Sequence, residues 1–305
     1  MARPVTPLSP QVTRDPAEHT PPARKGRLRW LRFLRNDKKA AVGLIILLVL
    51  TLAAIFAPLV SPYDPSAMAF DFLESPSLQH PLGTDDLGRD LLSRIIYGAR
   101  ISLFVGVSTV AISMVIGVGL GLLAGYYGGW LDNLIMRYID LQWAFPNFII
   151  AVYLVAVLGT GLENVIVAIS LGFLDDFARI TRGMVLSLKE KEFVEAARAL
   201  GASDARILLN HILPNSLAPI IVQATVSIAY AILAEAGLSF LGLGVKATTP
   251  TWGLILSDAR SFISRAWWLG VFPGLAIMLS VLSINFLGDT LRDILDVREQ
   301  HEASS

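Results

Sequence analysis

One apolar run carries charged residues that could do chemistry inside a membrane. The stretch 165–185 contains Asp175, Asp176, Arg179 and Arg182. Polar groups at such depth are costly, so they usually face a cavity or a partner. Arg179 follows Asp175 by four residues and Asp176 by three, a spacing at which helical side chains meet. Two interpretations stay open: an internally paired, neutral cluster, or one carboxylate that faces a path and attracts a cationic group such as a peptide amino terminus.

The remaining titratable residues do not form a catalytic or metal-binding set. The four histidines, at positions 19, 80, 211 and 301, are far apart in sequence and form no H-x-x-x-H pair, and the chain has no cysteine. It also lacks the G-x-x-x-x-G-K-[ST] sequence that binds nucleotide phosphates. We therefore predict no catalytic residue, no metal site and no ATP hydrolysis by this chain alone. A formal net charge of zero gives no reason to expect nucleic acid as a partner.

The elements that must position these residues are membrane-spanning helices. Of the 305 residues, 54% are hydrophobic and only 16% are charged. A helix needs roughly 20 residues to cross ~30 Å of hydrocarbon. The apolar runs predict an all-α membrane protein with six transmembrane helices, of which the third contains Arg137, Asp140 and a kinking Pro146. The six expected spans are 40–60, 101–124, 131–158, 165–185, 216–238 and 266–287.

Basic residues set the expected orientation, because cytoplasmic loops are rich in lysine and arginine. Eight basic residues lie between Arg24 and Lys39, directly before the first span. The loop 61–100 has six acidic residues against three basic ones, which places it outside. We therefore expect both termini in the cytoplasm and the chain in the cytoplasmic (inner) membrane of a bacterium or archaeon.

Two further patterns concern the second span and the loop before it. Gly117, Gly121 and Gly125 recur every four residues, which favours close helix packing, either within the chain or against a second subunit. In the outer loop, Thr84 or Asp85 could cap a short interfacial helix whose apolar residues recur at helical spacing. Those apolar residues are Leu87, Leu91, Leu92, Ile95 and Ile96.

The loop 189–215 contains an ordered amphipathic unit. Its apolar residues, Phe193, Val194, Ala197, Leu200, Ile207 and Leu208, alternate with charged ones. Gly201 breaks the pattern, Ser203 or Asp204 can cap a second short helix, and Pro214 is expected to end the unit. The residues alone leave two interpretations open: a helix resting on the lipid surface, or a docking element for another protein.

Several blocks of this sequence resemble one family. The segment EAARALGASDARILLNHILPN, residues 195–215, is similar to the cytoplasmic coupling loop of type I ABC-importer permeases. The blocks HPLGTDDLGRDLLSRIIYGARISL, APLVSPYDP, LSFLGLG, PTWG, FPGLAI and NFLGDTLRD resemble the second permease subunit of dipeptide, oligopeptide and nickel importers. The resemblance covers about residues 36–298. It departs from this branch at FLDDFAR, where the branch has small, proline or aromatic residues in place of the aspartates.

The resemblance implies the type I ABC-importer permease fold and a division of labour. A substrate-binding protein would deliver peptides, this chain and a homologous permease would line the path, and two ATP-binding subunits would hold the coupling loops. ATP and magnesium would then belong to the partners, and this chain would carry no cofactor. Glu195, Ala197 and Gly201 match motif positions and are expected to contact the ATPase or shape the loop. The wider set of coupling residues is Glu195, Ala196, Ala197, Gly201, His211, Leu213 and Pro214.

These observations predict five regions and leave three functions to compare. The regions are a cytoplasmic tail (1–38), the first span (39–62), an outer loop with an interfacial helix (63–100), the transport core (101–289) with its coupling loop, and a C-terminal tail (290–305). The first choice is a peptide-importer permease, and the second a nickel or metal-chelate permease. An ion-coupled secondary transporter, using Asp175 and Asp176 as ligands, is the alternative from another class.

Overall fold

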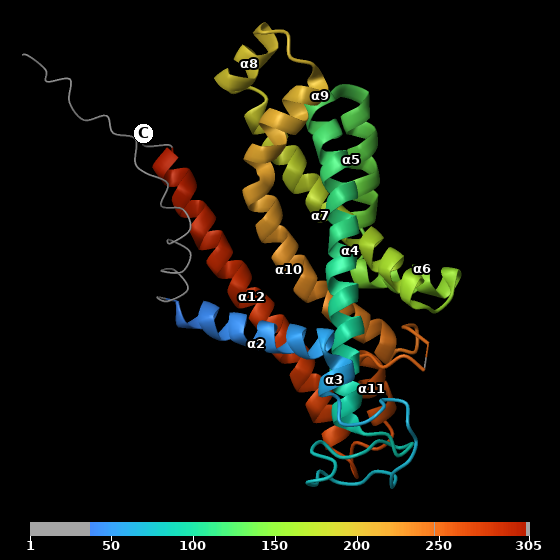
Figure 1. The fold of residues 1–305 in the computed structure, drawn as a ribbon. Coiled ribbons are helices and arrows are strands. Elements are labelled where there is room, and N and C mark those ends of the chain that lie inside the picture. The colour runs from blue at the N-terminus through green and yellow to red at the C-terminus, as the bar shows by residue number, and fades with distance from the viewer. Residues whose placement is uncertain (1–36, 247, 303–305) are drawn as a thin grey trace, which may run out of the picture. The chain divides into compact units, whose positions relative to one another are not determined.

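The computed structural model describes residues 37–246 and 248–302, and these contain helices and loops but no β-strand (Figure 1). The predicted N-terminal tail lies almost wholly outside the described residues. The helices are α2 (Lys38–Ile55), α3 (Ala57–Val60), α4 (Leu91–Tyr127), α5 (Gly129–Trp143), α6 (Asn147–Leu158), α7 (Leu162–Leu188), α8 (Glu192–Ala199), α9 (Asp204–Ile207), the π-helical η1 (Leu208–Ile212), α10 (Leu213–Phe240), α11 (Trp252–Ala259) and α12 (Trp268–Glu302).

The number of spans differs from the predicted six. Within the described residues, four helical segments are long and apolar enough to cross a membrane: Lys38–Ile55, Leu91–Tyr127, Asp204–Phe240 and Trp268–Leu295. The predicted third span is broken into α5 and α6, which meet at 91° and together make a fifth. Pro146, which has no N–H to donate, precedes the first residue of α6 and confirms the predicted kink. The 27 residues of α7 would extend ~40 Å, and its four central charges, not its length, separate it from the other spans.

The outer-loop helix was predicted wrongly as a separate element. Residues from Leu91 onward form the first turns of α4, a continuous helix of 37 residues. Asp90, and not Thr84 or Asp85, caps it by accepting a hydrogen bond from the Ser93 N–H at 2.8 Å. Leu87 stays in the preceding turn. The apolar spacing that suggested an interfacial helix therefore belongs to the outer end of the second span.

The glycine stripe of α4 packs against α7 of the same chain. A β-carbon at Gly121 would lie 2.7 Å from Thr181 Cβ, and one at Gly125 would lie 2.7 Å from Val185 Cβ. Only glycine permits this approach of the two backbones. The intrachain interpretation of the stripe is confirmed, and α7 runs beside α4 from Leu174 to Val185.

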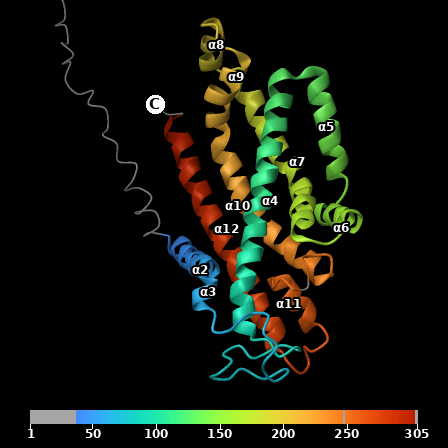
Figure 2. The same ribbon diagram turned by 45° about the vertical axis from the view of Figure 1, so that its right-hand side comes forward.

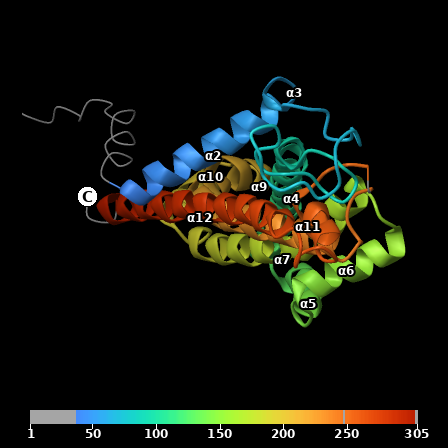
Figure 3. The same ribbon diagram turned by 90° about the horizontal axis from the view of Figure 1, so that it is seen from below.

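Two groups of short elements lie at opposite ends of the long helices. Figures 1 and 2 show α8 and α9 at one end of the helices, and α11 with the 61–90 loop at the other. Seen from below, α2 runs alongside α12 (Figure 3). The Thr290 hydroxyl donates to Asp37 Oδ2 at 3.0 Å, so the start of α2 lies beside the last third of α12.

Pro214 does not end the amphipathic unit as predicted. It lies in the first turn of α10, and the chain remains helical from Asp204 to Phe240. The preceding turn, η1, is a π-helix, whose turn is wider than that of an α-helix. This wider turn lies where Pro214, which has no N–H, cannot donate the usual helical hydrogen bond. Asn215 Nδ2 donates to the His211 carbonyl at 2.6 Å and satisfies that backbone oxygen.

Candidate functional site

The coupling segment, residues 189–215, is a helix–turn–helix unit at the end of the molecule opposite the outer loop. Helix α8 stops at Leu200, and Gly201 follows with φ +80°. The Gly201 N–H donates to the Arg198 carbonyl and the Ala202 N–H to the Ala197 carbonyl, both at 3.0 Å. This is a Schellman ending, which favours glycine at its left-handed position. The predicted break at Gly201 and the second helix after Ser203 are confirmed.

One face of the segment is fixed to its own chain. Val194, Ala197 and Ile207 are buried with Leu122 of α4 and Val185 of α7. Full burial of a valine or isoleucine side chain contributes roughly 1.5–3 kcal/mol. The segment is therefore held against the ends of two membrane helices and does not hang as a free loop. Ala197, expected as a contact or shape residue, is buried in this anchored face.

The opposite face is open to solvent. Leu200 is 89% exposed and Phe193 41% exposed, and Glu195 and Ala196 are also exposed. The single apolar face that the sequence suggested is thus divided, because Val194 and Ala197 face inward while Phe193 and Leu200 face outward. An exposed leucine and phenylalanine on a helix that is anchored by its other face are typical of a surface that binds another protein.

Polar contacts join the segment to the membrane helices. The Tyr126 hydroxyl at the end of α4 donates to Asp204 Oδ1 at 2.7 Å. Lys189 Nζ donates to the Gly125 carbonyl at 3.0 Å. A displacement of the segment would therefore act directly on α4.

The other predicted coupling residues lie on the stem of the segment and not on the exposed face of α8. His211 belongs to η1, and Leu213 and Pro214 begin α10. His211 and Leu213 are half-buried, and Pro214 is exposed. The predicted residues therefore divide into the docking face, the turn and the stem.

The charged cluster of α7 is not internally paired. Arg179 Nη2 donates to Asp140 Oδ1 at 2.6 Å, and its guanidinium stacks over Trp143 at 4.2 Å from the ring centroid. Asp176 accepts from Gln223 Nε2 of α10 at 3.3 Å. Asp175 is fully buried, and neither of its oxygens has a hydrogen-bond partner in the described part of the chain. Among the described residues, Arg179 thus makes its ion pair with Asp140 and not with Asp175 or Asp176, which favours the second interpretation.

A second ion pair closes the inner end of the α5–α7 contact. Arg182 Nε and Nη2 donate to the two oxygens of Asp132 at 2.6 and 2.7 Å. Such bidentate geometry is the strongest form of this interaction. Sequence reasoning named Arg182 but missed Asp132, although an acid at the start of one span facing a base near the end of the next was a usable signal.

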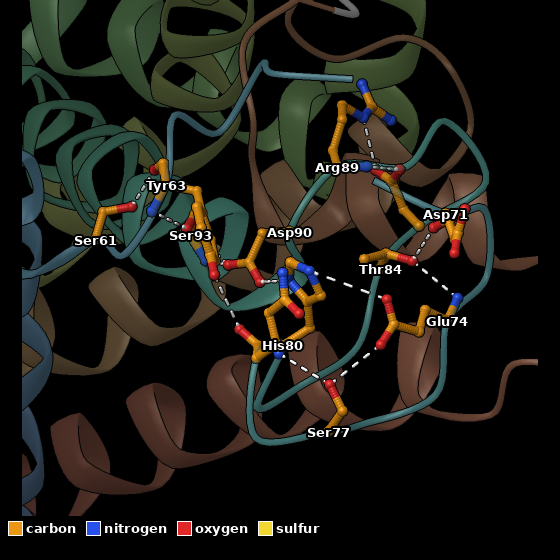
Figure 4. Close-up of polar contacts among 12 residues, drawn as sticks. Ser61, Tyr63, Asp71, Glu74, Ser77, His80, Thr84, Arg89, Asp90 and Ser93 are labelled. Carbon is orange, nitrogen blue, oxygen red and sulfur yellow. Dashed lines mark hydrogen bonds and ion pairs between the residues drawn. The ribbon is translucent and has the colours of Figure 1, made fainter. Parts of the chain in front are cut away.

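A buried polar network holds the outer loop on the start of α4 (Figure 4). His80 Nδ1 lies 2.9 Å from Asp90 Oδ1, and Thr84 Oγ1 donates to the Asp71 carbonyl at 2.6 Å. Arg89 Nε donates to Asp85 Oδ2 at 2.6 Å. The network gives a 30-residue loop without regular structure a fixed shape at the end of the helices opposite α8 and α9.

Arg89 and Arg94 both extend this network to Asp258 of α11. Arg94 also pairs with Asp85, and its Nη2 lies 3.3 Å from Asp258 Oδ2 of α11. Burial raises the pKa of the neighbouring Asp86 carboxyl above its ordinary value near 3.8, and the charges of Asp85 and Asp258 raise that pKa further. Asp86 Oδ1 has no partner among the described residues. Sequence reasoning had no signal for Asp258, which is 164 residues from Arg94 along the chain.

Comparisons with known proteins agree on one family. The profile of the binding-protein-dependent transport system inner membrane component matches residues 117–301, and that of the N-terminal TM domain of oligopeptide transport permease C matches residues 26–81. The dipeptide transport system permease protein of Alkalihalophilus pseudofirmus is 47% identical over 95% of both chains. The di/tripeptide permease protein of Pseudomonas aeruginosa is 47% identical over 90% of this chain and 92% of its own.

A third relative and a solved structure add to this. The glutathione transport system permease protein of Escherichia coli is 49% identical over 88% of both chains. The inward-facing MetNI methionine ABC transporter matches 67% of this chain and 97% of its own with a TM-score of 0.55 and 20% identity. That likeness confirms the predicted type I importer permease fold.

Proposed function

Because this chain belongs to the inner-membrane components of binding-protein-dependent transport systems, we propose that it forms half of the translocation path of a peptide importer. The family makes it a multi-pass membrane transport subunit and not an enzyme, as predicted. Three relatives are named for dipeptide, di/tripeptide and glutathione transport. These cargoes share peptide bonds, a free amino group and carboxylates, which supports peptide as the cargo class.

The partners in this proposal are a homologous second permease, two ATP-binding subunits and an extracytoplasmic substrate-binding protein. ATP and magnesium bind to the ATP-binding subunits, and both termini of this chain lie in the cytoplasm. The substrate-binding protein meets the face that carries the 61–90 loop.

One observation carries the mechanism: the coupling segment has a buried anchor and an open docking face. Val194, Ala197 and Ile207 fix it to α4 and α7, while Phe193 and Leu200 remain exposed. An ATP-binding subunit seated on that face would move α8 and α9 as one body. Tyr126 and Lys189 would pass that movement to α4. The membrane helices would then alternate between inward-open and outward-open states.

The docking assignment is tested by Leu200→Arg in the full complex. Leu200 is 89% exposed, so arginine costs little in folding but places a charge in an apolar interface. We expect the ATP-binding subunits to be lost from the purified complex, with at least a tenfold lower yield of co-purified ATPase. The matched control is Leu78→Arg in the outer loop, where the leucine is also fully exposed. Equal ATPase recovery from both variants would contradict the assignment.

The cargo is tested by uptake in cells that lack this chain and in cells with the chain restored. A labelled dipeptide and labelled nickel ion are supplied in parallel. We expect restored dipeptide uptake and unchanged nickel uptake. Restored nickel uptake alone would assign the chain to the metal-transporting arm of the family. Uptake that persists after ATP depletion, with the ion gradient maintained, would indicate a secondary transporter.

A further inference from the structure

A cavity of about 490 Å³ lies between α6, α7 and α10. Its volume falls in the ~300–1,000 Å³ range of small-molecule sites. The polar side chains lining it belong to Asp176, Asn147 and Tyr230, and aromatic residues including Phe148 and Phe173 supply apolar walls. Phe148 packs against α10, because a β-carbon at Gly237 would lie 3.0 Å from its ring. The wall formed by α6 is therefore braced against α10.

Asp176 brings a carboxylate to this cavity without a direct ion pair among the described residues. An ionised carboxylate can accept about four hydrogen bonds. Among the described residues, Asp176 accepts a hydrogen bond at 3.3 Å from the neutral side-chain amide of Gln223. That amide is also within 3.3 Å of the Ser227 hydroxyl. Arg179, three residues further along α7, is directed to Asp140 and Trp143. Arg179 therefore attracts the Asp176 carboxylate only through space, and the carboxylate lines the cavity with no cation bonded to it in the described part of the chain.

The depth of Asp176 excludes an ordinary solvated role. Fourteen residues separate it from Leu162 and twelve from Leu188, the two ends of α7, which is ~21 and ~18 Å along the helix. The segment of α7 around it packs along the glycine stripe of the spanning helix α4. A carboxylate halfway across a membrane needs a cavity, a partner or a path.

We propose that this cavity is a cargo subsite for a protonated primary amine, with Asp176 as the acceptor. This inference rests on the proposed peptide-transport function and deepens it. The ammonium group of the cargo donates to the Asp176 carboxylate and is flanked by the Asn147 amide and the Tyr230 hydroxyl. The aromatic walls accept the first side chain of the peptide. Asp175, which is fully buried and absent from the cavity lining, makes no contact with the cargo.

Binding to the complete transporter in lipid nanodiscs tests the subsite. The probes are labelled Ala-Phe, N-acetyl-Ala-Phe and N-acetyl-Ala-Lys, added without the substrate-binding protein. Hydrogen bonds to charged groups contribute about 1.5–3 kcal/mol, so we expect Asp176→Asn to weaken Ala-Phe binding about 10–100-fold. Asp176→Glu should retain most of the affinity. N-acetyl-Ala-Phe should bind weakly and equally to wild type and Asp176→Asn.

The control is Asp71→Asn, which removes the same charge from an exposed position in the outer loop. It should bind Ala-Phe as wild type does. If N-acetyl-Ala-Lys binding depends on Asp176, the site accepts a side-chain ammonium as well as the amino terminus. Photocrosslinking with a diazirine-bearing dipeptide should label α6, α7 or α10 in wild type and lose that labelling in Asp176→Asn.

Two results separate the failure of this subsite from the failure of the proposed function. If cells take up the dipeptide through wild type and Asp176→Asn with the same KM and rate, the subsite is refuted while the peptide function stands. If the wild-type chain restores no dipeptide uptake in cells, the peptide function itself is refuted.

Discussion

Gly201 offers a test of whether the shape of the coupling segment is what matters. The residue has φ +80° at the end of α8, and a left-handed conformation costs roughly 1–2 kcal/mol for a residue with a β-carbon. A β-carbon at this position would meet no atom within 4 Å. The whole cost of Gly201→Ala therefore comes from the backbone and none from a clash.

This cost should appear as local opening of the turn. A free energy of 1–2 kcal/mol raises the population of the opened state by about 5–30-fold. The N–H groups of residues 201 and 202 donate the two hydrogen bonds that close the turn onto α8, so the hydrogen exchange of these two amides should speed up by the same factor. ATP-driven uptake should fall, while insertion of the chain in the membrane should be unchanged.

Gly201→Asn is the matched control, because asparagine tolerates the left-handed region far better than alanine. It should show exchange and uptake between those of wild type and Gly201→Ala. Exchange of the Ala202 amide that is the same in Gly201→Ala and wild type would refute the reasoning. Gly201→Asn behaving worse than Gly201→Ala would also refute it, since side-chain size and not conformation would then decide.

Three further predictions concern packing, charge and pH. Gly125→Ala places a β-carbon 2.7 Å from Val185 Cβ and should cost about 1–3 kcal/mol, measured as a lower Tm than that of Gly119→Ala, whose β-carbon meets nothing within 4 Å. Asp132→Asn should lower the Tm, because it removes the negative charge and one of the two oxygens that accept from Arg182. The exchange Asp132→Arg with Arg182→Asp should recover part of this loss; no recovery would indicate that the site needs one orientation. Folding raises the pKa of Asp86 above its ordinary value near 3.8, so the Asp86 carboxyl makes the protein less stable as pH rises from about 3.8 through the raised pKa. Asp86→Asn should therefore raise the Tm at pH 7 and lose that advantage toward pH 4.

The sequence predicted most of the helices because apolar runs of sufficient length have few alternatives in a membrane. The break at Gly201, the kink at Pro146 and the packing role of Gly121 followed from local backbone rules that act over one turn. The separate outer helix was wrong because the periodicity of Leu91 to Ile96 is the same whether a helix ends there or continues.

The partner of Arg179 could not be predicted, because helical spacing identifies only partners along the same helix and this partner lies on another one. Arg179 is three or four residues from two aspartates, yet it pairs with Asp140 of α5. The predicted end of the unit at Pro214 was wrong for a different reason, since a π-helical turn accommodates this proline within a continuous helix. In both cases tertiary packing overrode a local preference.

The length of α4 has a mechanical consequence. At 37 residues it extends ~55 Å, which is more than a bilayer's hydrocarbon core, and it has no break. Its first turn is fastened to the outer loop by the contact of His80 with Asp90 and by the Tyr63 N–H, which donates to the Ser93 hydroxyl. Its last turn carries Tyr126, which is hydrogen-bonded to Asp204. Because α4 is one unbroken helix, a tilt imposed at the end that carries Tyr126 also tilts the end that holds the outer loop. In the proposed importer, a movement of the ATP-binding subunits would therefore reach the outer loop through a single helix.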